Sequence, residues 1–187
     1  ISGNFRDDDF QFHAKALTIQ NIVNYEKLVL KHPKLLSSDF DIKKEGDVYI
    51  LSNGEFEVYG IPLLFAVEYN RSSTKYAAKA QVKSASLQRL DKSLINRYAG
   101  DFQFYPLKGE IWVDADIKGS SSEKNAITLS SRIDRGAFIN KKEGIKIEDA
   151  FFSVRYTNGK FRSNRSSILD VDTLRFTSGD SKIAVSG

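Results

Sequence analysis

The chain of 187 residues carries 28 basic and 24 acidic side chains, a net charge of +4, and no cysteine. Its length suits one domain or a compact piece of a larger one, and the lack of cysteine excludes disulfides and thiolate metal sites. The positive excess is small, and the basic residues are spread along the chain. This distribution does not indicate a nucleic-acid binder. It predicts only weak attraction to anionic membranes.

The sequence contains no run of about 18 apolar residues, so it predicts no transmembrane helix. No signal peptide is visible, and methionine is absent. We therefore expect a processed or excised piece of a longer protein. The first three residues, Ile-Ser-Gly, resemble the last three, Val-Ser-Gly. Both triplets either close the same repeated β unit or are common turn residues.

Alternation of apolar and polar residues predicts strands through the first half of the chain, over 10–16, 63–69 and 76–82. Glu45-Gly46-Asp47 has the composition of a turn. Asn53-Gly54 predicts a second hairpin turn, between strands at 48–51 and 56–59, because both residue types tolerate positive φ.

The segment 87–98 departs from the strand pattern. Leu87, Leu90, Leu94 and Tyr98 recur with the period of a helix. Ser86 is suited to begin such a helix and Gly100 to end it. The sequence therefore predicts one helix of about twelve residues here.

The segment 110–118 predicts a half-buried strand. Its apolar residues Ile111, Val113, Ala115 and Ile117 alternate with charged ones, and only Trp112 is an apolar residue on the polar side. Later strands are expected over 127–133, 145–156 and 182–186, with turns at Glu143-Gly144 and Ser178-Gly179-Asp180. Asn158-Gly159 predicts a two-residue hairpin turn directly between two strands.

These runs predict about ten to thirteen strands joined mostly by short turns. The expected fold class is mostly β: a long antiparallel, curved or groove-like sheet of repeated hairpins, or a partly open sandwich, with one helix near 87–98. We expect residues 1–187 to form a single β-rich piece, with a first strand group over 1–83 and a second group, with the helix, over 84–187.

No catalytic motif is present, and no nucleophile elbow or phosphate-binding glycine loop is found. The two histidines, His13 and His32, lack the spacing of a metal site, and Asp7-Asp8-Asp9 is either a calcium-binding cluster or, more simply, solvated. We expect no enzyme activity, cofactor or metal.

Three further groups of residues leave alternatives open. Asp114 and Asp116 share a strand face at a separation compatible with glycoside hydrolysis, but surface carboxylates are the simpler interpretation. Arg162 and Arg165 form either a phosphate or lipid head-group site or a solvated loop. Thirteen Phe and eight Tyr form either ordinary core or an apolar groove for acyl chains.

The segment 107–119 resembles the glycine–strand–"I-x-G" element of AsmA-like proteins of Gram-negative bacteria. The order of the later elements is similar too: a helix before this strand, a strand leading to Arg135-Gly136-Ala137-Phe138, then 145–156, the Asn158-Gly159 turn, and the closing segment 174–187. The resemblance is strongest to Bacteroidetes members. It covers 84–187 well and 1–83 only as similar strand texture.

The resemblance implies a periplasmic fragment of a protein anchored in the inner membrane by a segment outside this sequence. It also implies a non-enzymatic role in outer-membrane biogenesis and phospholipid transport along an apolar β groove. Its partners would be phospholipid or other acyl chains, with no nucleic acid and no cofactor. The candidate groove residues are Ile111, Val113, Ala115, Ile117, Phe152, Val154 and Tyr156.

An alternative function is a cell-surface β-sandwich module for binding or adhesion. Exposed Trp112 and Tyr59 would then be the residues that stack on sugars. The two hypotheses differ in the sheet interior, because a sandwich buries both inner faces whereas a lipid-binding sheet leaves one apolar face open.

Overall fold

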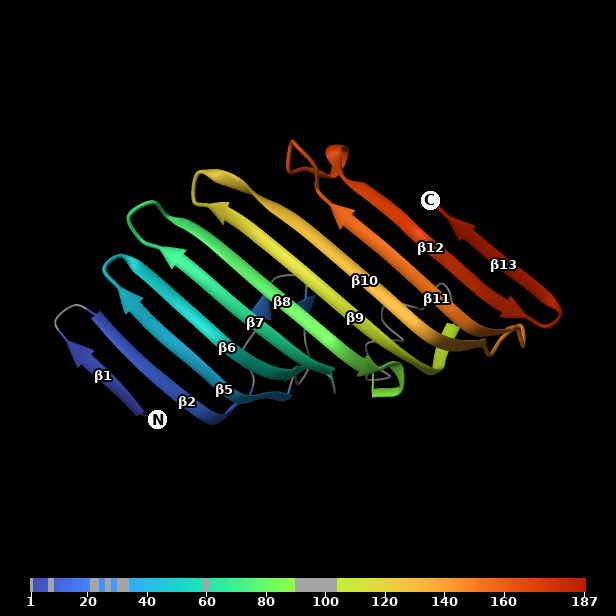
Figure 1. Cartoon of the computed structure of the whole chain (residues 1–187), viewed down its shortest axis with the longest axis horizontal. Helices are drawn as coiled ribbons and strands as arrows, with labels where there is room; N and C mark the ends of the chain where they lie inside the picture. The colour runs from blue at the N-terminus through green and yellow to red at the C-terminus, as the bar shows by residue number, and fades with distance from the viewer. Residues whose placement is uncertain are drawn as a thin grey trace. The chain divides into compact units, whose positions relative to one another are not determined.

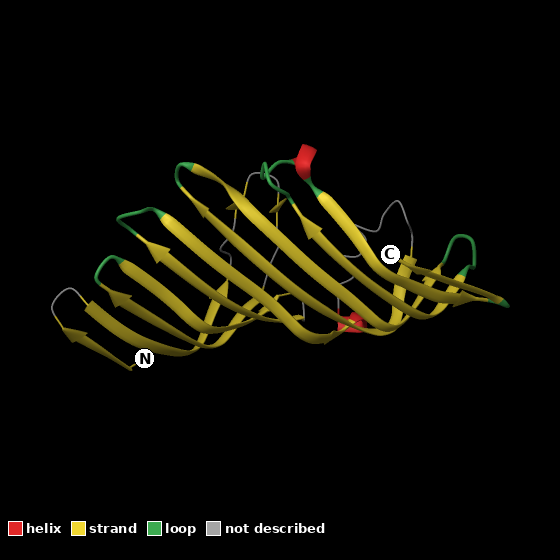
Figure 2. Ribbon diagram, turned by 45° about the horizontal axis from the view of Figure 1, so that its top comes forward, coloured by secondary structure: helices red, strands yellow, loops and turns green. Residues whose placement is uncertain are grey.

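A computed structural model describes residues 2–6, 9–20, 24–25, 28–29, 34–58, 61–89 and 104–187. These residues form thirteen strands and two 3-10 helices, with no α-helix among them. In Figure 2 the two short helices are the only helical turns drawn among the described residues. The predicted mostly-β fold is confirmed.

Eleven strands form a single open antiparallel sheet in the order β1-β2-β5-β6-β7-β8-β9-β10-β11-β12-β13 (Figure 1). Apart from β3 and β4, which pair with each other, the strands follow one another in chain order. The bounds are β1 Ser2–Arg6, β2 Asp9–Gln20, β3 Asn24–Tyr25, β4 Leu28–Val29, β5 Lys34–Glu45, β6 Val48–Val58, β7 Ile61–Asn70, β8 Lys75–Ser86, β9 Phe104–Ser120, β10 Glu123–Asn140, β11 Lys146–Thr157, β12 Ile168–Ser178 and β13 Ser181–Ser186.

The chain divides into two compact units. Unit 1 comprises residues 1–80 and 116–125, and unit 2 comprises residues 81–115 and 126–187. Strands β8, β9 and β10 contribute residues to both. Each unit is described below by itself.

Three predicted turns lie where the sequence places them. Gly46 has φ +55 and follows Glu45, which pairs with Val48 across the β5–β6 hairpin. Gly179, also at φ +55, has the same place between β12 and β13. Gly144 lies in the β10–β11 turn with φ +71. Positive φ is accessible to glycine at little cost, which explains why these positions end strands.

The predicted hairpin turn at Asn53-Gly54 is wrong. β6 continues through both residues to Val58, and the register with β7 shifts between Leu51 and Gly54. Asn53, at φ +53, is therefore part of a β-bulge rather than a turn. A Cβ atom at Gly54 would overlap the ring of Phe65, so the glycine lets this cross-strand aromatic lie over the backbone.

The Asn158-Gly159 turn is correctly placed, but the predicted two-residue hairpin is wrong. The chain does not return directly to a strand at Lys160. A connection over 158–167, which contains the 3-10 helix η2 (Asn164–Ser166), leads to β12. Its ten residues are called the 158–167 loop below.

The predicted helix over 87–98 is described only at its start. Leu87–Arg89 forms the 3-10 helix η1, not the first turn of an α-helix. Residues 90–98 lie outside the described part of the chain. Leu87 itself is the most deeply buried large side chain described, with 2% of its surface exposed.

Candidate functional site

In unit 2, one face of β10 to β13 carries rows of mostly apolar side chains. Residues paired directly across antiparallel strands share a face. The paired rows are Leu129–Tyr156–Leu169, Ser131–Val154–Val171, Ile133–Phe152–Leu174–Val185 and Phe176–Ile183. We call these residues the apolar face.

A β-bulge in β12 keeps this face continuous. Val154 pairs with Val171, whereas its neighbour Ser153 pairs with Thr173, so Asp172 is an extra residue in β12. Leu169 and Val171 occupy odd positions and Leu174 and Phe176 even ones. The extra residue brings both pairs to the same face, which simple alternation would not do. The Asp172 carboxylate accepts a hydrogen bond from Ser153 Oγ at 3.2 Å.

The opposite face of the same strands is polar. Its rows include Ser130–Arg155–Asp170 and Arg132–Ser153–Thr173. Unit 2 therefore has one apolar and one hydrated face across β10 to β12.

Large side chains of the apolar face remain exposed. Leu169 exposes 64% of its surface, Val185 54% and Ile183 44%. Leu129 and Val171 are also among the exposed large hydrophobic residues, and Phe152, Val154 and Tyr156 are half-buried. A second protein layer would bury such residues, so their exposure in the described part of the chain is compatible with an open groove.

A contact with Arg132 explains why Trp112 lies on the polar side of β9. The guanidinium carbon of Arg132 lies 4.3 Å from the centre of the indole ring, a cation–π contact. Because Arg132 belongs to a polar row, alternation along β9 places Ile111, Val113 and Ala115 on the other side of the strand, and all three are half-buried. Ile117 lies in unit 1 and is half-buried there.

Six of the seven candidate residues thus lie in unit 2, three on the apolar face of β11 and three on the corresponding side of β9. The sequence prediction missed the other apolar residues of this face: Leu129, Ile133, Leu169, Val171, Leu174, Phe176, Ile183 and Val185. In β12 the sequence contains two apolar pairs, 169/171 at odd positions and 174/176 at even ones. Only a bulge between them places both pairs on one face.

A cluster of small residues lies beneath Leu87 in the same unit. A Cβ atom at Gly109 would lie 2.8 Å from Gly136 Cα and 3.0 Å from Leu87 Cδ1. Gly136 in turn faces the Cβ of Ala150, which is buried. Glycine and alanine on three neighbouring strands let the leucine pack flat against the backbone, so this part of unit 2 is closely packed.

In unit 1, a polar cluster links β2, β5 and β6. His13 Nδ1 lies 2.8 Å from Asp41 Oδ1, and Asn53 Nδ2 donates to Asp41 Oδ2 at 2.7 Å. The hydrogen bond from Asn53, followed by the one from His13, lowers the pKa of Asp41. The cluster anchors the bulged residue Asn53 to β5, so it supports the backbone locally.

The carboxylates considered for hydrolysis have ordinary surface partners. Asp114 Oδ1 accepts a hydrogen bond from Gln81 Nε2 at 2.6 Å, and Asp116 lies 4.0 Å from Lys79 Nζ. Asp7, Asp8, His32 and Tyr59 lie outside the described residues. In the described part of the chain, no group of three or more His, Cys, Asp or Glu side chains could hold a metal ion.

No helix in the described ranges is both long enough and apolar enough to span a bilayer. Comparison with known protein families, curated proteins and solved structures finds no match to this chain.

Proposed function

We propose that this chain is a non-enzymatic envelope protein of AsmA type that binds phospholipid acyl chains along the apolar face of its sheet. The observation that carries the proposal is the exposure of Leu169, Val171, Ile183 and Val185 on one side of an open sheet. The order of motifs along 84–187 supports the family assignment, and with it a periplasmic location and a role in outer-membrane biogenesis.

The energetics of lipid transfer fit such a face. An acyl chain that leaves a bilayer needs apolar cover, and each buried CH₂ group contributes about 0.8 kcal/mol. The apolar rows of β10 to β13 offer aliphatic and aromatic cover without a shaped pocket. The polar head group would stay in water, so we expect low selectivity among lipids and no cofactor.

A photocrosslinking experiment tests this proposal in cells. p-Benzoylphenylalanine placed at Val154 or Val113 is expected to form lipid adducts, which mass spectrometry of the purified protein detects. The same group at Arg155 or Asp114, the adjacent residues on the opposite side of each strand, is the matched control. Lipid adducts at neither valine, or equal adducts at all four positions, would contradict the proposal.

The alternative of a sandwich module has less support. The eleven main strands form one open sheet rather than two packed ones. Trp112 is half-buried and Arg132 covers one face of its ring, which leaves less of the ring for a sugar than the fully exposed side chain that this alternative expects.

A further inference from the structure

Two segments of the chain are basic and free of acidic residues: 69–90, with five basic residues, and 150–169. Residues 150–169 contain four basic residues, Arg155, Lys160, Arg162 and Arg165, and no acidic residue. Three of the four cations lie in the 158–167 loop, between β11 and β12 of unit 2.

The loop has a defined structure that holds these side chains in place. Asn158 is buried, and its Oδ1 accepts a hydrogen bond from the Ile127 backbone N–H at 2.9 Å. Ser166 Oγ donates to the Asn158 carbonyl oxygen at 2.7 Å, closing the loop on itself. Gly159, at φ +68, lies so close to the Ser166 carbonyl that a side chain would not fit. The loop is thus anchored at its base.

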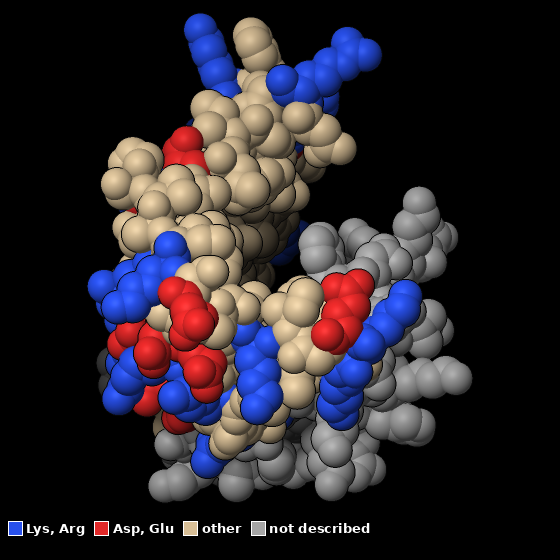
Figure 3. Space-filling model, turned by 90° about the vertical axis from the view of Figure 1, so that its right-hand side faces the viewer, with Lys and Arg blue, Asp and Glu red and all other residues tan. Residues whose placement is uncertain are grey.

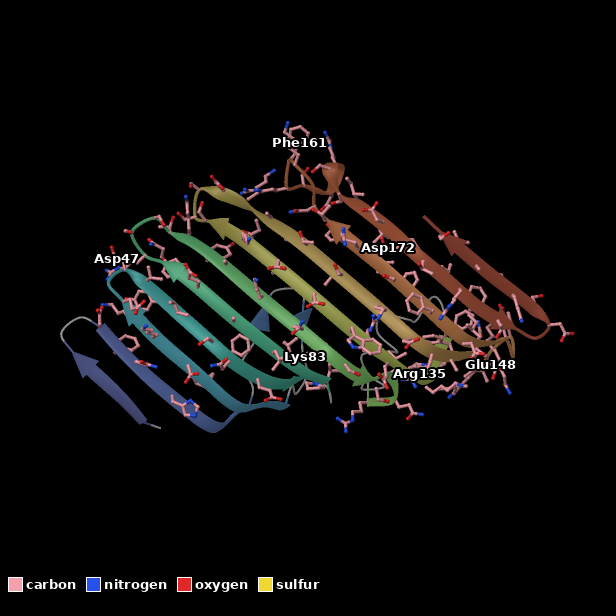
Figure 4. All side chains as sticks on the ribbon, viewed as in Figure 1. Asp47, Lys83, Arg135, Glu148, Phe161 and Asp172 are labelled. Atoms are coloured by element: carbon pink, nitrogen blue, oxygen red, sulfur yellow. The ribbon has the colours of Figure 1, made fainter. Side chains whose placement is uncertain are left out.

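The tip of this loop presents an aromatic side chain between cations. Phe161 exposes 73% of its surface, the largest value among the exposed large hydrophobic side chains described. Lys160 and Arg165 are exposed as well. Figure 4 shows Phe161 projecting away from the strands, and Figure 3 shows basic side chains projecting at the same upper end of the molecule. Lower in that view, basic and acidic side chains are intermixed.

We propose that the 158–167 loop docks this protein onto an anionic lipid bilayer. Lys160 and Arg165 contact lipid phosphates, and Phe161 inserts its ring at the level of the head groups. Cations near an anionic membrane gain attraction from its surface potential, and an exposed aromatic ring is stabilised in the interface. The chemistry recognised is a phosphodiester surface with an apolar layer beneath it.

The composition of the tip favours a bilayer over a nucleic acid. Single-stranded nucleic acids bind grooves that combine cations with several stacking aromatic residues. The loop has one aromatic residue, and Ile168, the residue that follows the loop, is an exposed aliphatic side chain. These side chains suit insertion between lipids. This docking is separate from acyl-chain binding on the apolar face, because neither Lys160, Phe161 nor Arg165 belongs to that face.

Vesicle co-sedimentation with the full chain tests the proposal. Wild-type protein is expected to bind phosphatidylcholine vesicles that contain phosphatidylglycerol, and not pure phosphatidylcholine, at ~0.15 M salt. The variant Lys160→Gln/Arg165→Gln is expected to bind about thirtyfold more weakly, or about fivefold per cation. The control Lys75→Gln/Lys83→Gln removes the same charge elsewhere and is expected to change binding less than about twofold.

A second variant separates insertion from charge. Phe161→Ser is expected to lower vesicle binding about tenfold while leaving its salt dependence unchanged. Phe161→Trp in a Trp112→Phe background provides a depth measurement, because its fluorescence is expected to be quenched by brominated lipids. These substitutions are at exposed or half-buried positions, and circular dichroism spectra before and after heating report whether each variant folds.

Four results would overturn the docking proposal. They are equal binding of the wild type to neutral and anionic vesicles, equal losses in the loop and control variants, displacement by inorganic phosphate at constant ionic strength, and tighter binding to a single-stranded RNA than to vesicles. Displacement by phosphate would indicate a small-anion site, and RNA preference a nucleic-acid site. Crosslinking at Val154 tests acyl-chain binding on the apolar face independently of vesicle binding. A failure of one proposal is therefore distinguishable from a failure of the other.

Discussion

Two regions of unit 2 treat apolar side chains in opposite ways. Leu87 is 2% exposed and packs over Gly109, whereas Val185 on β13 is 54% exposed. The difference lies in the neighbours. Beneath Leu87 three adjacent strands carry glycine or alanine, so one large side chain fills the space. On the apolar face every strand contributes large side chains, and they cannot cover one another within a single layer.

The packed cluster under Leu87 therefore contributes stability, whereas the exposed rows are the part that we propose contacts lipid. The packed cluster under Leu87 is expected to resist substitution, because its atoms already lie at contact distance. The exposed rows of β12 and β13 are expected to tolerate substitution with little loss of stability. The substitutions below test that division, from the largest expected effect to the smallest.

The first prediction concerns Gly109. Its φ of +124 is rarely adopted by other residues, and an added Cβ would lie 2.8 Å from Gly136 Cα. Gly109→Ala is expected to lower the free energy of unfolding by about 4 kcal/mol, from backbone strain and overpacking together. Gly46→Ala is the matched control, because Gly46 also has positive φ but no atom within 4 Å of the added Cβ. Its expected cost is about 1 kcal/mol. Denaturant unfolding measures both, and equal costs would remove the packed-cluster interpretation.

The second prediction concerns Leu87. Leu87→Ala is expected to cost about 3 kcal/mol, since it leaves a cavity above Gly109 and Gly136. Leu107→Ala, at a leucine that is 45% exposed in the same unit, is expected to cost about 0.5 kcal/mol. Thermal unfolding of the two variants side by side measures the difference. A Leu87→Ala protein as stable as Leu107→Ala would show that this cluster does not hold the unit together.

The third prediction concerns the bulge in β12. Deletion of Asp172 leaves Leu169, Val171, Leu174 and Phe176 in strict alternation, so the apolar face is kept and the expected cost is within about 1 kcal/mol. Deletion of Arg175 instead turns Phe176 to the polar face, at an expected cost of about 2 kcal/mol. Denaturant unfolding compares the two deletions. The reverse order of stability would mean that Asp172 is not the extra residue.

The fourth and smallest prediction concerns Asp41 in unit 1. Its pKa is lowered below the ordinary value of 3.8, so its charged form stabilises the fold above that pH. This stabilisation is lost as pH falls through the lower, folded-state pKa. The stability difference between wild type and Asp41→Asn is therefore expected to shrink on acidification. Asn53→Gly removes the hydrogen bond that contributes most to lowering the Asp41 pKa, and it keeps positive φ accessible. The stability difference between wild type and this variant is therefore also expected to shrink on acidification. Acid unfolding followed by circular dichroism measures both, and a difference independent of pH would contradict the assignment.

The sequence by itself determined the strands, several of the turns and the sidedness of the sheet. Alternation in 110–118 and 152–156 predicted strands that the structure contains, and Gly46, Gly144 and Gly179 marked the turns of the β5–β6, β10–β11 and β12–β13 hairpins. These features are local, because side-chain direction follows backbone pleating and positive φ follows from glycine itself.

Only the tertiary structure decided what each irregular position does. Asn53-Gly54 and Asn158-Gly159 have the same local composition, yet the first lies in a bulge within β6 and the second opens a ten-residue loop. Positive φ is compatible with either outcome, and the choice depends on which strands pair beside them. The pairing of β12 likewise decided that Leu174 joins Leu169 on one face. Long-range hydrogen bonds fix such registers, and no local pattern contains them.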